Sequence, residues 1–333
     1  MTRIVGLGVY LPEQRQTAAQ IAAASGLPEW VVTDKLGIRK KTVPGVDDHT
    51  NAMGVSAARE ALRRAGREPG ELDLLISMTE EYKEYPVWTA GIKTAHELGA
   101  HRAWAFDIGQ KCGTAILGLK LARDMMTADS SVMYGLLAGG YRNGDLIDYA
   151  DPNVRFLYNL AAGGGAAVLG RDGPGFEVLE AAIRTDGSFS EDVIVPVGGT
   201  REPYNGHNRD RFRFQVPDPD GMKQRLEQKS LENFEAVARE ACQRSGVDPS
   251  QVRHAAVLHM KRSAHDTILS RLGIDAERSI YLSDYGHIGQ VDPLLSLKLA
   301  QDQGRFRNGD VALLLAAGIG YVWNALCVRW TES

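Results

Sequence analysis

The sequence predicts a duplicated α/β fold in which two similar halves each layer helices over largely buried strands. Three pairs of similar segments recur in the same order, with the members of each pair about 180 residues apart. Three ordered matches at one offset indicate two copies of one fold, and the period is far too long for a solenoid. The pairs are residues 59–79 and 239–259, residues 108–124 and 288–302, and residues 136–141 and 314–321.

Each copy repeats the same series of elements. Its first helix stops at a glycine, Gly66 or Gly246, and a turn with proline then leads into a buried strand. A second helix, a short strand, an apolar helix and a last strand follow. The apolar helix comes after "IGQ" and is apolar nearly all round, which indicates a buried helix. We therefore expect the halves to span residues 1–172 and 173–333, with their two buried helices side by side at the centre.

Composition restricts the class of protein. The 333 residues are 44% hydrophobic and 24% charged, as in soluble globular proteins, and the net charge of −4 argues against general nucleic-acid or membrane binding. Three scattered cysteines predict neither a disulfide framework nor a zinc site. The start of the chain shows no signal-peptide pattern, and no apolar run is as long as a membrane span. We expect a cytoplasmic protein.

The two copies differ where chemistry is expected. Cys112 stands at the start of the first buried helix, and Asp292 stands at the corresponding place in the second. A helix N-terminus favours the thiolate, so we expect a lowered pKa and a nucleophilic Cys112. A buried structural cysteine is the alternative there, and it is the interpretation adopted for Cys242 and Cys327.

Two histidines occupy matching positions in the second copy. His259 ends a buried strand where the first copy has Thr79, and His287 precedes the second buried helix where the first copy has Asp107. The carboxyl ends of strands are where α/β folds place their active sites. A histidine there can activate a thiol or donate a hydrogen bond to an oxyanion. Cys112, His259 and His287 are therefore the predicted catalytic set.

The ordered motifs resemble the thiolase superfamily, and within it the β-ketoacyl-ACP synthase III group of condensing enzymes. The resemblance covers nearly the whole chain and implies a thiolase-like αβαβα fold. The segments that carry it are "IVGLGVYLP" (residues 4–12), "EWVVT" and "LGIR" (residues 29–39), residues 106–113, "YGH" (residues 285–287) and residues 317–330.

The resemblance implies roles for single residues. Cys112 matches the nucleophile that takes an acyl group from a CoA or carrier-protein thioester, and His259 matches the first active-site histidine. Trp30 matches the position that stacks on the CoA adenine, and Arg39 lies in the same entrance segment. Tyr85 matches the aromatic side chain by which a partner subunit closes the acyl pocket.

The chain departs from the group at several positions. His287 replaces the usual asparagine, and the resulting Cys-His-His set resembles that of the elongating synthases. Arg262 replaces an asparagine shortly after His259 and is a candidate substrate-binding residue. Ile319, between two glycines, would supply an oxyanion-hole amide together with Cys112. Asp292 has no counterpart and could orient His287 as a carboxylate–imidazole pair.

An acidic stretch and a basic stretch stay open to two interpretations. Glu80 lies near the catalytic glutamate of the related hydroxymethylglutaryl-CoA synthases, although its acidic neighbours favour a solvated loop. The basic residues between the copies are either a solvated surface or a docking site for a carrier protein or the CoA phosphates. They are Arg201, Arg209, Arg211, Arg213, Lys223, Arg225 and Lys229.

The predicted function is a two-step acyl transfer through an acyl-Cys112 intermediate, followed by decarboxylative condensation with a malonyl-type thioester. Acyl transfer to an alcohol or amine, with His287 and Asp292 as the base, is the first alternative. A non-decarboxylative CoA condensation and a non-catalytic scaffold are the others. We expect no metal and no cofactor beyond CoA or carrier-protein substrates. A homodimer is expected because residues 132–139 resemble the edge strand through which the family joins its sheets.

Overall fold

Nine strands join into one mixed sheet in the computed structural model, which describes residues 1–332. Their order is β5-β4-β6-β7-β1-β8-β11-β10-β9, and a separate two-stranded sheet pairs β2 with β3. The strands are β1 (Arg3–Tyr10), β2 (Arg15–Thr17), β3 (Lys40–Thr42), β4 (Leu74–Ser77), β5 (Trp104–Asp107), β6 (Tyr134–Tyr141), β7 (Gly163–Gly170), β8 (Gly175–Thr185), β9 (His254–Val257), β10 (Val311–Gly318) and β11 (Val322–Thr331).

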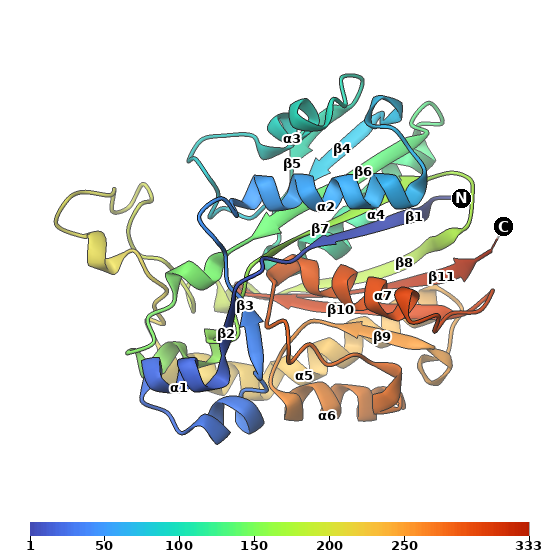
Figure 1. The fold of residues 1–333 in the computed structure, drawn as a ribbon. Coiled ribbons are helices and arrows are strands. Elements are labelled where there is room, and N and C mark those ends of the chain that lie inside the picture. Colours follow the sequence, from blue (N-terminus) through green and yellow to red (C-terminus); the bar gives the residue numbers. More distant parts are fainter. Residues whose placement is uncertain (333) are drawn as a thin grey trace.

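Helices complete the five alternating layers expected of a thiolase-like fold (Figure 1). Helices α2 and α3 cover the strands of the first half, and α5 and α6 cover those of the second half. Between the two sets of strands lie α4 and α7. No helix within residues 1–332 is both long enough and apolar enough to cross a membrane. The helices are α1 (Ala18–Ser25), α2 (Thr50–Ala65), α3 (Ala90–Leu98), α4 (Thr114–Ala128), α5 (Pro219–Arg244), α6 (Arg262–Leu272) and α7 (Asp292–Asp302).

Strand pairing repeats in the two halves. In the first half β6 runs parallel to β4 and antiparallel to β7, and in the second half β10 runs parallel to β9 and antiparallel to β11. The expected short strand of the second copy is reduced to a single bridge between Ala255 and Ser279. The halves meet where β1 pairs with β8 through only two residue pairs, Arg3 with Glu177 and Ile4 with Phe176.

The central layer holds the two apolar helices. Every residue of α7 from Asp292 to Leu297 is buried, and so are seven positions of α4. The short turns before them, Lys111–Gly113 and Gly289–Val291, lie against each other. The two predicted buried helices therefore both begin at the middle of the molecule.

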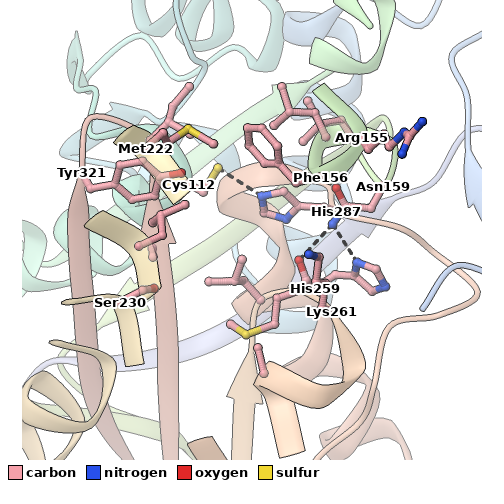
Figure 2. A pocket seen from close by; sticks show the side chains of 18 of the residues that line it. Cys112, Arg155, Phe156, Asn159, Met222, Ser230, His259, Lys261, His287 and Tyr321 are labelled. Carbon is pink, nitrogen blue, oxygen red and sulfur yellow. Dashed lines mark hydrogen bonds between the residues drawn. The ribbon is translucent and has the colours of Figure 1, made fainter. Parts of the chain in front are cut away.

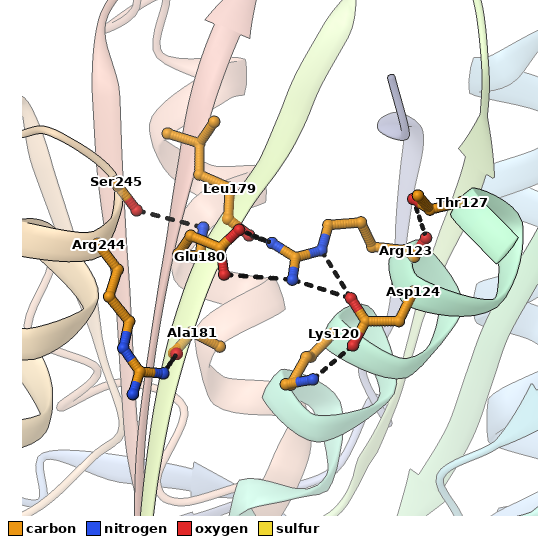
Figure 3. A network of polar contacts seen from close by, with 9 residues as sticks. All are labelled: Lys120, Arg123, Asp124, Thr127, Leu179, Glu180, Ala181, Arg244 and Ser245. Carbon is orange, nitrogen blue, oxygen red and sulfur yellow. Dashed lines mark hydrogen bonds and ion pairs between the residues drawn. The ribbon is translucent and has the colours of Figure 1, made fainter.

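Polar contacts fix the far end of α4 to the second half (Figure 3). Arg123 of α4 lies 3.0 Å from the carboxylate of Glu180 on β8, and the backbone amide of Glu180 donates to Ser245 Oγ at 3.2 Å. Arg244, the last residue of α5, donates to the Ala181 carbonyl at 3.0 Å. These bonds tie α4, β8 and α5 together away from the turn that carries Cys112.

The predicted edge strand is wrong. Residues 134–141 form β6, which pairs on both sides, with β4 and with β7. The free edge of the first half is β5, where Trp104 is 52% exposed and stacks on Phe106 with ring centroids 5.4 Å apart. Strand order depends on tertiary packing, so the apolar composition of 132–139 indicated a strand without showing its neighbours.

Candidate active site

The carboxyl ends of the central strands and the turns before α4 and α7 surround one cavity of about 690 Å³. Cys112, His259, His287 and Ile319 all line it. Its outer wall is the first half of α5, with the segment 152–157 opposite. The remaining lining includes Leu36, Glu80, Lys111, Tyr141, Asn143, Asn159, Phe214, Met222, Leu226, Ser230, Phe234, Met260, Lys261 and Tyr321.

Cys112 lies in the short turn immediately before α4 and is 8% exposed. The residue before it, Lys111, has a φ of 52°, a left-handed conformation that costs energy in a non-glycine residue. The end of β10 packs directly on this turn, because a Cβ on Gly318 would lie 3.0 Å from the Cys112 nitrogen. Ile319, the next residue, is thereby placed beside the nucleophile turn.

His287 forms a hydrogen-bonded chain with Cys112 and Asp292, of which Figure 2 draws the contact between Cys112 and His287. His287 Nε2 lies 3.2 Å from Cys112 Sγ, and His287 Nδ1 lies 2.5 Å from Asp292 Oδ2. Asp292 also accepts from the Ile288 amide at 2.7 Å and from the His259 amide at 2.8 Å. With its side chain fully buried, the carboxylate is held in one position by these donors.

The charges in this chain depend on one another. Burial lowers the pKa of His287, but the Asp292 carboxylate and the Cys112 thiol outweigh it and hold that pKa well above its usual value. Burial raises the pKa of Cys112, while His287 opposes the rise. The expectation that the helix N-terminus lowers the thiol pKa is therefore wrong in its net direction, because desolvation dominates. Ionisation of Cys112 depends on transfer of its proton to His287.

His259 lines the same cavity with both ring nitrogens engaged by the protein. Nε2 lies 3.1 Å from the Gly37 carbonyl, to which it donates, and Nδ1 lies 2.9 Å from Asn159 Nδ2, from which it accepts. Burial lowers the pKa of His259 to about 4, so the ring is neutral at pH 7. Figure 2 shows the ring turned toward Asn159. Asn159 was missed by sequence reasoning because it lies 100 residues away without a motif around it.

Four predicted substrate-binding residues lie outside the cavity lining. Arg262 is exposed, pairs with Asp266 at 2.9 Å and covers the Tyr281 ring, so its side chain does not line the cavity. Trp30 is 56% exposed, and the exposed Arg39 pairs with Asp284. Tyr85 is exposed on the loop after β4 and packs edge-to-face on Trp88. The cations on the cavity rim are instead Arg155, Lys223 and Lys261.

Most of the predicted basic cluster is paired. Five of its seven members lie within 4 Å of a carboxylate, which reduces its value as an anion-docking surface. The pairs are Arg201 with Glu191, Arg211 with Glu202, Lys223 with Glu227, Arg225 with Asp192, and Lys229 with Asp186.

Two charged residues at the site are buried, one in the cavity lining and one beside Asn159. Glu80 is only 4% exposed and accepts from Asn143 at 3.1 Å, so the interpretation as a solvated loop residue is wrong. Lys41 is 1% exposed and donates to the carbonyls of Tyr158 at 2.9 Å and Leu160 at 2.6 Å, on either side of Asn159. Burial lowers the pKa of Lys41 to about 7.

Comparisons with known proteins agree with the fold and the motifs. Residues 106–187 match the family model described as 3-Oxoacyl-[acyl-carrier-protein (ACP)] synthase III, and residues 242–330 match the model of its C-terminal part. The chain is 27% identical over 331 residues to a Beta-ketoacyl-[acyl-carrier-protein] synthase III of Roseiflexus sp. (strain RS-1), covering 98% of each chain.

Solved structures show the same fold. The crystal structure of 3-oxoacyl-[acyl-carrier-protein] synthase III from Aquifex aeolicus VF5 superposes with a TM-score of 0.84 at 24% identity, covering 99% of this chain and 100% of that one. The priming β-ketosynthase from the R1128 polyketide biosynthetic pathway gives a TM-score of 0.85 at 24% identity, covering 100% and 97%.

Proposed function

Because the chain belongs to the 3-oxoacyl-[acyl-carrier-protein] synthase III family of thiolase-like condensing enzymes, we propose that Cys112 is its acylated nucleophile. The thiol proton moves to His287 Nε2, and the sulfur attacks the carbonyl carbon of an acyl thioester. The C–S bond to the carrier breaks, and the leaving thiolate of CoA or acyl carrier protein takes the proton from His287. The 3.2 Å contact between Cys112 and His287 supports this step.

The backbone beside Cys112 suits the oxyanion that forms in both half-reactions. Amides of Cys112 and Ile319 would donate to it, as preorganised donors do in other acyl-transfer enzymes. The close approach of Gly318 to the Cys112 nitrogen supports this pairing, since it fixes Ile319 next to the nucleophile. A side chain at residue 318 would push β10 away, so Gly318→Val is expected to slow acylation.

In the second half-reaction a malonyl-type thioester loses carbon dioxide, and the resulting carbanion attacks the acyl group on Cys112. The new C–C bond forms as the Cys112–acyl bond breaks. Neutral His259 would donate a hydrogen bond to the enolate oxygen, and so would His287 once Nε2 has taken up a proton again, because Asp292 holds the Nδ1–H and keeps the pKa of the ring raised. For this His259 must release the Gly37 carbonyl, which its Nε2 holds at 3.1 Å.

A second candidate is acyl transfer to a hydroxyl or amino group, and the chain Asp292–His287–Cys112 favours it. A buried carboxylate that orients a histidine beside the reacting atoms is the arrangement by which enzymes take a proton from an attacking alcohol or amine. Both ring nitrogens of His259 are already hydrogen-bonded to the protein, so this histidine has no free N–H to donate to an enolate.

One variant separates the two reactions. Asparagine in place of His287 can still donate to an enolate but cannot take a proton. If condensation is the reaction, His287→Asn keeps a measurable share of product formation with a malonyl thioester. If acyl transfer is the reaction, activity falls by about a hundred- to ten-thousand-fold. Because His287 takes the thiol proton, His287→Asn should slow acylation of Cys112 in either case. Acylation is therefore followed separately by mass spectrometry, and product formation is measured on protein that already carries the acyl group.

A homodimer and a thioester carrier complete the proposal. The free edge at β5, with its exposed Trp104, supports pairing of two copies, since unpaired apolar edges are rarely left open. The exposed Tyr85 lies on the loop between β4 and α3 and would reach the partner copy's acyl pocket. Trp30 and Arg39 would bind the CoA end of the carrier at the surface.

A further inference from the structure

The inner end of the cavity is polar, although most of its walls are apolar. Glu80 follows β4 and Asn143 follows β6, so both belong to the first half of the molecule, as Cys112 does. Glu80 is 4% exposed and Asn143 is 9% exposed. Asn143 Nδ2 donates to Glu80 Oε2 at 3.1 Å, which joins the two side chains into one pair.

Each member of this pair keeps one oxygen without a partner. Within residues 1–332, neither Glu80 Oε1 nor Asn143 Oδ1 has a hydrogen-bond partner, although both atoms are buried. Unsatisfied buried polar atoms are rare and costly, so their presence in a cavity indicates a ligand group that satisfies them. An amide oxygen can only accept, and a carboxylate can only accept. The missing ligand group must therefore be a hydrogen-bond donor.

The pair lies on the side of Cys112 that the acyl group would occupy. The other end of the cavity opens between exposed residues, among them Asn153, Lys223 and Lys261, so the bulky carrier must enter there. The closed end then receives the part of the thioester that stays on the sulfur. Glu80, Asn143 and Cys112 line the same cavity, so the pair is within reach of an acyl group carried by the sulfur.

We propose that the acyl group carried by Cys112 bears a hydrogen-bond donor, a hydroxyl or an amino group, which binds Glu80 Oε1 and Asn143 Oδ1. This inference rests on the proposed acylation of Cys112 and adds the class of its substrate. A saturated acyl chain of the same length would leave both oxygens buried without a partner. The free-energy cost of burying these two oxygens without a donor makes the pair a specificity determinant, as in other sites built to bind a polar group.

Burial raises the pKa of Glu80 to about 7, against the opposing charge of Lys111. The carboxyl group is therefore partly protonated near neutral pH. The ionised form accepts from a hydroxyl or from an ammonium, and its charge favours the ammonium. Two donor chemistries therefore fit the pair, and the experiment distinguishes them.

The test measures acylation of Cys112 by intact-protein mass spectrometry, with 3-hydroxybutyryl-CoA, 3-aminobutyryl-CoA and butyryl-CoA as probes at equal concentration. The wild-type protein is expected to acylate at least about tenfold faster with one of the first two than with butyryl-CoA. Asn143→Leu, which keeps the volume and removes the acceptor, should reduce this ratio to near one. Ser131→Ala, a polar change at an exposed position after α4 and outside the cavity lining, should leave the ratio unchanged.

Glu80→Gln identifies the donor. It keeps an acceptor for a hydroxyl and removes the charge that pairs with an ammonium, so a preference that survives the change indicates a hydroxyacyl group, and one that disappears indicates an aminoacyl group. Equal or faster acylation by butyryl-CoA in the wild-type protein would overturn the inference and leave acylation of Cys112 standing. Absence of any adduct with all three probes would refute both.

Discussion

Replacing Asp292 by asparagine removes the carboxylate on which three N–H groups converge. The donors are His287 Nδ1 at 2.5 Å, the His259 amide at 2.8 Å and the Ile288 amide at 2.7 Å. Asparagine offers one oxygen and one NH₂ group in the same space. Its NH₂ group must face at least one of these donors, and that donor stays buried without an acceptor.

The structural cost of Asp292→Asn is expected to be about 1–3 kcal/mol of unfolding free energy, the penalty of one unsatisfied buried polar group. The catalytic cost is larger. Without the carboxylate, burial becomes the main influence on His287 and its pKa falls, so that it no longer holds the proton of Cys112. By analogy with other enzymes in which a carboxylate orients a histidine, acylation should slow by about 10³- to 10⁴-fold.

The pH dependence of stability follows from the raised pKa of His287. A raised folded-state pKa means that the folded protein binds this proton more tightly than the unfolded chain does. The resulting stabilisation is complete below the unfolded pKa of about 6.5 and disappears as pH rises through the folded value. The difference in unfolding free energy between wild type and Asp292→Asn should therefore be largest below pH 6.5 and should shrink in alkaline solution.

Rapid-quench mass spectrometry of the Cys112 adduct between pH 6 and 9 measures the rate, and chemical denaturation measures the stability. Asp302→Asn is the matched control, since Asp302 ends the same helix and pairs with Arg64 and Lys298 at the surface. It should acylate at the wild-type rate. A folded Asp292→Asn protein that acylates within threefold of wild type would refute the assigned role of Asp292.

Three further outcomes are expected. Cys112→Ala should abolish acyl-CoA adducts while circular dichroism and melting stay unchanged, and an adduct on this variant would contradict the assignment of the nucleophile. Trp104→Glu at the β5 edge should convert a dimer to the 36.3 kDa monomer in light scattering, and a wild-type protein that is already monomeric would contradict the proposed dimer. Lys41→Met should remove a rise in stability between pH 7 and about 10.5, because the pKa of Lys41 is lowered to about 7 and the unfolded chain binds the proton more tightly. Denaturation at pH 7 and 9.5 tests this, and parallel curves for both proteins would disprove it.

The duplicated architecture could be predicted because its signal is long. Buried segments such as those after "IGQ" constrain many positions at once, so two copies stay recognisable across the offset. The position of Cys112 between them follows from the same comparison. The ionisation of Cys112 does not follow from it, because the pKa depends on the burial of the side chain and on a contact with His287, 175 residues away.

Predictions from local composition were wrong where tertiary contacts determine the environment of a side chain or strand. Glu80 stands among acidic neighbours, a pattern typical of solvated loops, yet its side chain is buried against Asn143, 63 residues further on. The ring of His259 is held by Asn159 and by the Gly37 carbonyl, contacts that no spacing rule connects. Strand order failed for the same reason, since the sequence of β6 fits an edge strand and a central strand equally well.

The active-site chain can be understood as a consequence of the duplication. Cys112 and Asp292 occupy equivalent positions in the two copies, and the turns that lead into α4 and α7 lie against each other. The residues at the start of the two helices therefore face the centre of the molecule, one from each half. The N-terminus of α7 stabilises the negative charge of Asp292, while the turn before α4 exposes Cys112 to the cavity. His287 lies between them and bonds to both. The two copies differ at this pair of equivalent positions, and the histidine of the second copy joins the two residues into a nucleophile and its oriented base.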